Sequence, residues 1–487
     1  METAFQFLIP ILLPIISGLL IGYLKPLRNP IMQRLFFLTV LILNSVLVLY
    51  LSFMGNKSFE LFRLTERLPI LFRNDDLARF FCVLTSTMFV LVGIYCPEYM
   101  RHEANEHRFY MFYLMVLGMM MGFGLSANLM TLYLFLEILT FISIPLVLHS
   151  MKKEAIAAAY KYLYYSIAGA AMVLIGFFFV YTYGTTINFT PGGVIDLHML
   201  AGRENQILVF TMLTIIGFGA KAGMYPLHAW LPIAHPVAPS PASAILSGII
   251  TKIGIFATIR FVYYLIGPDQ LRGTWMQTAW ISLALFTSIM GSMLAFREPV
   301  LKRRLAYSTI SQIGYIQLGL GILTKAGLIG ALLHMVFHSI AKNALFLIAG
   351  IIIIKTHKTN VSELGGIGKK MPALISCFAL LAITLAGIPP TAGFISKWQL
   401  ISGLLEADIG FFTWLGPAVL LVCALLAAFY LFPIVIDGFF VNTKLEKVKL
   451  EFSMLLPVIL LAAAAIIFGL FPDVLISFSE RIAGELL

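Results

Sequence analysis

The sequence predicts an all-α polytopic membrane protein of about fourteen transmembrane helices. Of its residues 60% are hydrophobic and only 11% are charged, whereas soluble proteins average about 25% charged residues. Apolar segments recur along the chain, and most reach the ~20 residues that a helix needs to cross a bilayer. They lie near residues 4–24, 31–53, 77–95, 108–126, 128–149, 158–183, 206–225, 240–266, 277–296, 306–324, 327–354, 372–405 (interrupted), 412–438 and 454–477.

We expect one integral membrane domain over residues 1–487 and no soluble domain. The longest polar stretches, about 54–76 and 184–205, are predicted loops. The first apolar segment lacks a small-residue cleavage site, so we interpret it as a retained helix. Within the domain we expect N-terminal helices over about 1–107, a first repeat over 108–266, a second repeat over 277–438 and a last helix over 454–477.

The positive charges are unevenly distributed between alternate loops. We number the loops between the predicted helices in chain order. The odd-numbered loops hold seventeen Lys and Arg residues, whereas the even-numbered loops and the C-terminal tail hold eight. The positive-inside rule places the odd loops in the cytoplasm, so both termini are predicted on the outer side of a cell (inner) membrane. The net charge of +10 is explained by this distribution, and we predict no nucleic-acid partner. Lipids are expected around the helices.

The sequence offers no ligands for a cofactor. The four cysteines are scattered without CxxC spacing, which argues against thiolate-held zinc or iron–sulfur clusters. There is no phosphate-loop motif and no dinucleotide fingerprint. We therefore predict no cofactor and no metal, and expect any redox chemistry to belong to partner subunits.

Ionisable side chains stand inside segments that should cross the membrane. A lysine at the centre of a bilayer costs roughly 2.5–3.5 kcal/mol on insertion scales. Intramembrane ionisable groups usually line ion or proton paths, so we interpret these side chains as a path. They are one carboxylate, Glu137, and five lysines: Lys161, Lys221, Lys252, Lys342 and Lys397.

Two predicted helices are interrupted in a similar way. Residues 217–226 read GFGAKAGMYP and residues 386–397 read AGIPPTAGFISK, so each places a lysine beside a Gly/Pro break. The two lysines, Lys221 and Lys397, are 176 residues apart. Carbonyls freed at membrane depth need water or polar partners. Paired broken helices point to a transporter's ion site and to an internal repeat.

Glu137 and Lys221 are predicted to act as a switchable pair. A nearby carboxylate favours the charged lysine, whereas burial alone can lower a lysine's pKa by up to ~5 units. Separation of the two groups would therefore release a proton near neutral pH. The alternative is a static structural ion pair. Lys252, one helix further along, is a further candidate for the same path.

His334, His338 and Lys342 are spaced four residues apart, so they share one helix face. We favour a proton relay, because histidine titrates near neutral pH. The alternative is a hydrogen-bonded polar seam between helices. Zinc is disfavoured, since no glutamate follows the first histidine and no third ligand is evident.

Three further side chains are candidate relay members. Lys161 is near the cytoplasmic end of its helix, where it could instead extend its amine to the interface. His228 and His235 lie in the proline-rich segment 226–236, where packing in a loop is nearly as good an interpretation.

Four sequence blocks resemble the antiporter-like subunit family of respiratory complex I, membrane-bound hydrogenases and Mrp-type cation/proton antiporters. The resemblance covers about residues 95–440. The blocks are KAGMYPLHAWLPIAHPVAPSPASAILSGIITKIGIF from Lys221, KRRLAYSTISQIGY from Lys302, HMVFHSIAKNALFLIAG from His334 and GIPPTAGFISKW from Gly387.

This resemblance implies inverted repeats formed by helices 4–8 and 9–13, with helices 7 and 12 broken. It implies that Glu137 and Lys221 are the coupled pair and Lys252 a connecting lysine. His334, His338 and Lys342 would lie on a hydrated central axis, and Lys397 on the exit side. Some family members carry glutamate at the last position, whereas this chain has lysine.

The leading prediction is a non-catalytic, proton-translocating subunit of a multisubunit redox pump related to complex I or a membrane-bound hydrogenase. Its partners would be other membrane subunits, including antiporter-like or small ones. A second hypothesis is an Mrp-type Na⁺/H⁺ antiporter subunit without redox coupling; the path is richer in amines than in the oxygen ligands that Na⁺ prefers. A third is a structural membrane subunit that has lost transport, against which the buried charges argue.

Overall fold

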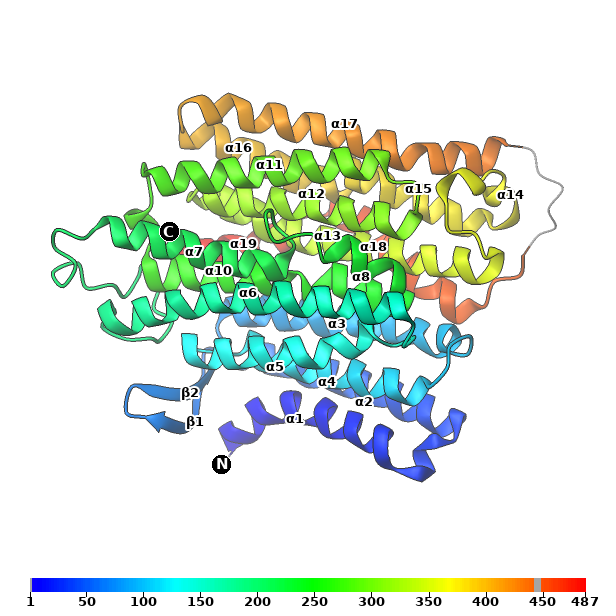
Figure 1. Cartoon of the computed structure of the whole chain (residues 1–487), viewed down its shortest axis with the longest axis horizontal. Helices are drawn as coiled ribbons and strands as arrows, with labels where there is room; N and C mark the ends of the chain where they lie inside the picture. The colour runs from blue at the N-terminus through cyan, green and yellow to red at the C-terminus, as the bar shows by residue number, and fades with distance from the viewer. Residues whose placement is uncertain (1, 442–447) are drawn as a thin grey trace.

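The computed structural model describes residues 2–441 and 448–487. Long helices run nearly parallel to one another. The chain progresses from the N-terminal helices at one edge of the bundle to residues 411–440 at the other, and its C-terminal segment returns to the middle (Figure 1). Two of the seventeen positive charges predicted in the odd loops, Lys444 and Lys447, lie outside the described residues.

The N-terminal edge is formed by α1 (Glu2–Tyr23), α2 (Pro30–Ser52) and α3 (Asp76–Met100), with the short turn η1 (Lys25–Arg28) between the first two. The predicted loop 54–76 instead holds an antiparallel hairpin of β1 (Ser58–Thr65) and β2 (Leu68–Arg73), with Ser58 opposite Arg73. The mixed polar and apolar residues of this stretch carried no strand signal strong enough to be recognised.

The middle of the chain continues with α4 (Glu106–Gly124), α5 (Leu129–Val147), α6 (Lys153–Tyr183) and α7 (Asn205–Ala222). A short α8 (Leu231–Val237) follows. The predicted segment 240–266 is one helical rod with two wider π-type stretches, namely α9 (Ser240–Ile245), η2 (Leu246–Ile250), α10 (Lys252–Ile259) and η3 (Arg260–Ile266).

The remaining helices follow after the turn η4 (Pro268–Gln270). They are α11 (Trp275–Arg297), α12 (Leu301–Gly321), α13 (Lys325–Thr356), η5 (Val361–Glu363), α14 (Ile367–Lys370), α15 (Pro372–Ala386), α16 (Ala392–Ala407), α17 (Phe411–Phe440), α18 (Phe452–Leu470) and α19 (Asp473–Leu486). The predicted last helix, 454–477, is therefore not continuous. It ends at Leu470 and restarts after Pro472, whose ring cannot continue the preceding helix.

Several helices begin at side chains that satisfy free backbone donors. Asp75 accepts the Ala78 amide (2.9 Å) at the start of α3, and Asn128 accepts the Thr131 amide (2.8 Å) at the start of α5. Thr274 and Thr324 do the same for α11 and α13. Such caps satisfy orphan N–H groups at helix N-termini.

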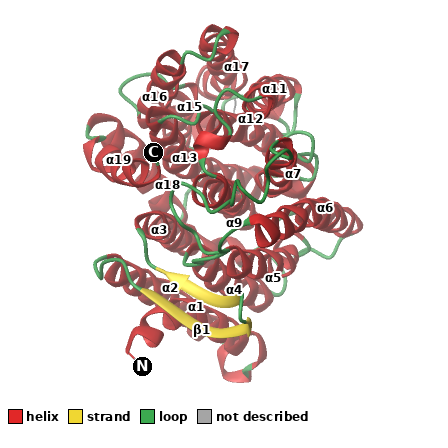
Figure 2. Cartoon of the chain, turned by 90° about the vertical axis from the view of Figure 1, so that its left-hand side faces the viewer, coloured by secondary structure: helices red, strands yellow, loops and turns green. Residues whose placement is uncertain are grey.

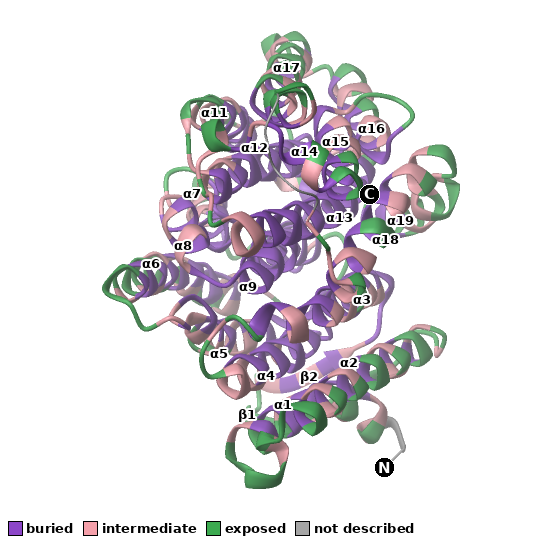
Figure 3. Cartoon of the chain, turned by 90° about the vertical axis from the view of Figure 1, so that its right-hand side faces the viewer, coloured by how far each residue is buried: buried purple, intermediate pink, exposed green. Residues whose placement is uncertain are grey.

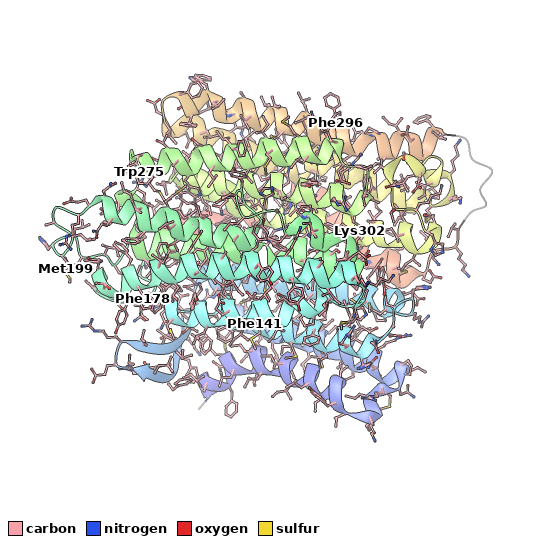
Figure 4. All side chains as sticks on the ribbon, in the orientation of Figure 1. Phe141, Phe178, Met199, Trp275, Phe296 and Lys302 are labelled. Atoms are coloured by element: carbon pink, nitrogen blue, oxygen red, sulfur yellow. The ribbon has the colours of Figure 1, made fainter. Side chains whose placement is uncertain are left out.

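Among the described residues, eleven helices are long and apolar enough to cross a membrane. Phe141, Phe178 and Phe296 are more than half exposed on the sides of the bundle (Figure 4), as expected of lipid-facing or subunit-facing surfaces. The chain is a multi-pass helical membrane protein.

The core of the bundle is built around two elements. The rod 240–266 is wholly buried and α13 is 89% buried over its most apolar window. Figure 3 shows buried residues concentrated on α9, α12 and α13, with exposed residues on α1, α2, α6 and α17 at the rim. Polar side chains on these central elements are therefore remote from the periphery.

The loops alternate between two ends. The hairpin, the connection between α6 and α7 and both chain termini lie at one end (Figures 1 and 2), whereas α14 lies at the other. We call the end that holds α14 and the predicted odd loops the α14 end.

Candidate functional site

Lys221 lies at a helix end that the sequence makes abrupt. Helix α7 ends at Ala222, and Gly223 has a positive φ of 84°, a conformation that glycine adopts without a steric penalty. In the last turn, the Lys221 amine donates to the hydroxyls of Thr140 (2.8 Å) and Tyr162 (2.8 Å). Its side chain is buried, so hydroxyl groups from α5 and α6 replace its water.

Glu137 lies one helical turn before Thr140 on α5 and is half-buried. It interacts electrostatically with Lys221, but none of the ion pairs between described residues joins the two groups. The predicted pair is therefore held apart in this structure, with the lysine bound to hydroxyls.

Lys252 and His338 are in direct contact. The Lys252 amine lies 2.6 Å from His338 Nδ1 and 2.6 Å from the Ser247 carbonyl oxygen. Lys252 follows the π-type stretch η2, a local geometry that is frequent at functional sites. Lys252 is fully buried and His338 almost so, so one amine and one imidazole share a site inside the bundle.

His334 continues this contact along α13. The rings of His334 and His338 are stacked, with centroids 6.3 Å apart. His334 Nδ1 lies 2.9 Å from Ser396 Oγ, and Nε2 lies 2.9 Å from Gln312 Oε1. The predicted shared face of these two histidines is thus confirmed. Lys342, one turn further, donates to the Leu305 carbonyl and the Ser308 hydroxyl on α12.

Lys397 forms the other end of the row. Its amine donates to the Leu385 carbonyl (2.6 Å) and lies 5.1 Å from the centre of the Tyr315 ring. The Tyr315 ring in turn stacks on His334 at 5.3 Å. We define the central row as Lys252, His338, His334, Tyr315 and Lys397.

The two helix breaks share a local geometry, but their lysines lie on opposite sides of the break. Helix α15 ends before Gly387 with φ 80°, as α7 ends before Gly223. An interval of 164 residues separates these glycines, and the same interval separates Pro226 from Pro390. The same interval leads from Lys221 to Leu385 and not to Lys397. Lys397 comes from the helix after the break and brings its amine to the Leu385 carbonyl.

The three further candidates have different surroundings. Lys161 is exposed on the outer face of α6, so the expectation that it is buried with the other lysines is wrong. Helix periodicity turns Tyr162, the next residue, inward instead. His228 is half-buried in the turn after α7 and its ring lies 5.8 Å from that of Tyr225. His235, in α8, is fully buried against Phe346.

Sequence reasoning missed the tyrosines of the site. Tyr162 accepts from Lys221 and exchanges a hydrogen bond with Ser143 (2.8 Å), while Tyr315 stands between Lys397 and His334. Each is one of many aromatic residues in apolar segments, so composition gave no signal. Within the part of the chain that the structure describes, no three His, Cys, Asp or Glu side chains come together as a metal-binding group.

A family model described as "NADH:quinone oxidoreductase/Mrp antiporter, TM" matches residues 126–422. Subunit N of NADH-quinone oxidoreductase from Desulforudis audaxviator is 31% identical, over 83% of this chain and 82% of that protein. A Na⁺/H⁺ antiporter subunit from Alkalihalophilus pseudofirmus is 30% identical, over 85% of this chain and 83% of that protein.

The fold also matches a solved structure. A chain of the Mrp complex from Dietzia sp. DQ12-45-1b superimposes with a TM-score of 0.86 at 21% identity, and the match covers 100% of this chain and 98% of that one. At this identity the likeness concerns the fold alone.

Proposed function

Because this chain belongs to the NADH:quinone oxidoreductase/Mrp antiporter membrane family, and is thus an antiporter-like subunit, we propose that its own buried side chains carry protons. The observation that supports this best is the central row. It places two lysines, two histidines and one tyrosine in successive contact within the bundle. Lysines and histidines can exchange protons when their environments shift their affinities.

In the proposed mechanism Glu137 controls the charge of Lys221. When the Glu137 carboxylate approaches, it stabilises the Lys221 ammonium. When only Thr140 and Tyr162 contact the amine, this stabilisation is absent and Lys221 releases its proton more easily. Moving one charge against 100 mV requires ~2.3 kcal/mol. A change of about two pKa units supplies as much, since each unit is worth ~1.4 kcal/mol.

Lys252, His338, His334 and Lys397 then form the transport path, with Lys342 attached to it on the α12 side. A proton passes directly between Lys252 and His338. Water would carry it past the stacked rings of His338, His334 and Tyr315 to Lys397. Each transfer restores the donor to its neutral form. His228 remains a candidate on the basis of the sequence alone. Lys161, exposed on α6, is not part of the proposed path.

We further propose fourteen membrane crossings. The fourth to eighth crossings, over residues 108–266, and the ninth to thirteenth, over residues 277–438, would form inverted repeats. The two glycine-terminated breaks, at Gly223 and Gly387, support this repeat. The location of both termini at the end opposite α14 is consistent with an even number of crossings. The charge distribution favours termini on the outer side of a cell membrane.

Partner subunits are part of the proposal. The relatives are subunits of an NADH-quinone oxidoreductase and of a Na⁺/H⁺ antiporter, and the matching solved chain is part of an Mrp complex. We propose that this chain likewise works beside other membrane subunits, with redox chemistry, where present, in those partners.

Replacement of Lys221 by alanine tests the function. Membrane vesicles that contain the whole complex would be energised, and internal pH would be followed with a fluorescent dye. We expect assembly to persist and proton translocation by this subunit to be lost. Unchanged translocation in a fully assembled Lys221→Ala complex would refute the proposal.

Sodium transport is the second candidate, and the hydroxyl cluster around Lys221 favours it, because oxygen ligands suit Na⁺. Thr140, Tyr162 and Ser166 all lie within 3.5 Å of the Lys221 amine. Translocation that requires Na⁺ at constant proton gradient would select this function. Mass identification of co-purifying subunits would separate a redox pump from an antiporter.

A further inference from the structure

A cavity of about 510 Å³ lies at the α14 end, outside the central row. It is bounded by the loop between α3 and α4, the turn between α5 and α6, and the end of α8. Its walls carry Glu103, Arg108 and Lys152, and residues Pro236 and Val237 of α8 line it as well. The cavity is therefore polar on one side and adjoins α8 on the other.

His235 directly precedes that α8 wall. It is fully buried, and neither of its ring nitrogens has a hydrogen-bond partner among the described residues. Buried polar groups nearly always have a partner, and an exception calls for an unseen water or a functional role. A neutral imidazole needs one donor and one acceptor, which water passing through this region would supply.

Lys302 connects the cavity to His235. It lies in the first turn of α12, is buried, and donates to the carbonyl of Ala238 (2.6 Å), the residue that follows α8. In Figure 4 Lys302 lies in the half of the molecule nearer the α14 end. It interacts electrostatically with Glu103 of the cavity wall and with His235.

His235 also interacts electrostatically with Lys342 and Lys252. The charged groups that act on its ring are therefore three amines, one on the cavity side and two on the side of the central row. No carboxylate of the described residues is among them. A protonated His235 is consequently unstable while these amines are charged, and becomes easier to form when one of them is neutral.

We propose that this cavity is the entrance through which protons from the α14 side reach the central row, with Glu103 as the collecting group and His235 as the transient carrier. The inference rests on the proposed function. A proton from Glu103 travels through water to one ring nitrogen of His235. The opposite nitrogen releases its own proton inward to neutral Lys342 or Lys252, and the imidazole is again neutral.

Gating follows from the charges. Because Lys342 and Lys252 repel a proton on His235 when both are charged, the entrance conducts only after the row has passed a proton onward. Lys302 holds the end of α8 in place through the Ala238 carbonyl. While it is charged, it adds to the repulsion that prevents His235 from retaining the proton. Proton uptake and proton movement along the row are thereby coupled.

The test uses the complete complex in inside-out vesicles, whose α14 side faces the medium in the proposed topology. We expect His235→Ala to lower proton translocation by about ten-fold or more at normal assembly, and Glu103→Gln to lower it less. The matched control is Glu98→Gln, because Glu98 pairs with Arg101 at the same end but does not line the cavity. Its rate should remain unchanged.

Imidazole added to the medium should restore the His235→Ala rate in these vesicles. Full activity of His235→Ala overturns the inference. Lys221→Ala is measured in parallel: if it abolishes transport while His235→Ala and Glu103→Gln do not reduce it, the entrance is refuted and the proposed function stands. If Lys221→Ala has no effect, the function itself fails.

Should His235→Ala prevent assembly, Glu103→Gln on the cavity wall decides alone. A rate equal to that of Glu98→Gln then refutes the entrance.

Discussion

The amine of Lys252 and the imidazole of His338 lie 2.6 Å apart in the centre of the bundle. Both side chains are buried, and the second nitrogen of His338 has no partner among the described residues. The contact joins a helix of the first predicted repeat to a helix of the second. It is the point at which a proton would cross between the two halves.

Two substitutions of His338 distinguish a relay from a static polar seam. Asparagine can place an amide oxygen close to the position of Nδ1 and accept from Lys252, but it cannot pass a proton on; phenylalanine does neither. Since positioned proton transfer contributes at least about a hundred-fold, we expect both variants to lose that much translocation in dye-based vesicle assays. A seam predicts instead that His338→Asn retains the wild-type rate.

The hydroxyls around Lys221 should matter individually. Tyr162→Phe removes one of two acceptors at 2.8 Å, and a hydrogen bond to a charged group is worth about 1.5–3 kcal/mol. We expect translocation to fall about ten-fold with little change in assembly. Thr182→Val is the matched control on the same helix. Thr182 lies on the exposed face, and its one hydroxyl bond among the described residues goes to the Phe178 carbonyl. Equal rates for the two variants would contradict this role.

The sequence predicts well which residues form the apolar helices, and poorly which way a given side chain on such a helix points. Apolar segments located the helices to within a few residues, and a spacing of four placed His334 and His338 on one face, as the stacked rings confirm. Lys161 has the same apolar context as Lys252 but points outward, because hydropathy along a segment does not say which face meets a neighbour. For the same reason Tyr162 could not be separated from the exposed Tyr160 and Tyr164.

The tertiary structure determines which residues contact one another across the bundle. The contact between Lys252 and His338 spans 86 residues, and that between Lys221 and Thr140 spans 81. No local pattern specifies such distances. The break before Gly387 was recognised from Gly and Pro, yet the same kind of signal at Pro472 was overlooked within a continuous apolar run.

A buried ion pair outside the proposed path should contribute strongly to the stability of the folded protein. Arg260 is fully buried and donates to both carboxylate oxygens of Asp75 at 2.7 Å. Asp75→Asn keeps a cap for α3, since asparagine is also a good N-cap residue, but leaves the guanidinium without its counter-charge. Removal of one partner of a buried pair costs about 3–5 kcal/mol.

We expect a clear fall in the thermal unfolding temperature of the detergent-solubilised complex. Arg63→Gln, which breaks the exposed pair with Glu60 on the hairpin, is the control and should have no measurable effect. A wild-type unfolding temperature for Asp75→Asn would show that Arg260 finds another partner.

His149, in the turn between α5 and α6, should make stability depend on pH. Burial, and then the charge of Arg108, lower its pKa to about 4, whereas an unfolded histidine titrates near 6.5. The unfolded chain therefore binds a proton that the folded protein refuses between these values, so stability is complete above pH ~6.5 and declines as the pH falls toward 4. The shift corresponds to about 3 kcal/mol.

His149→Asn removes this titration, so the variant should lose less stability than the wild type between pH 6.5 and 4 in thermal unfolding of the detergent-solubilised complex. His198→Asn, at an exposed position in the loop between α6 and α7, controls for the loss of a histidine as such and should follow the wild-type curve. Parallel declines of wild type and His149→Asn would mean that His149 gains access to solvent before the protein unfolds.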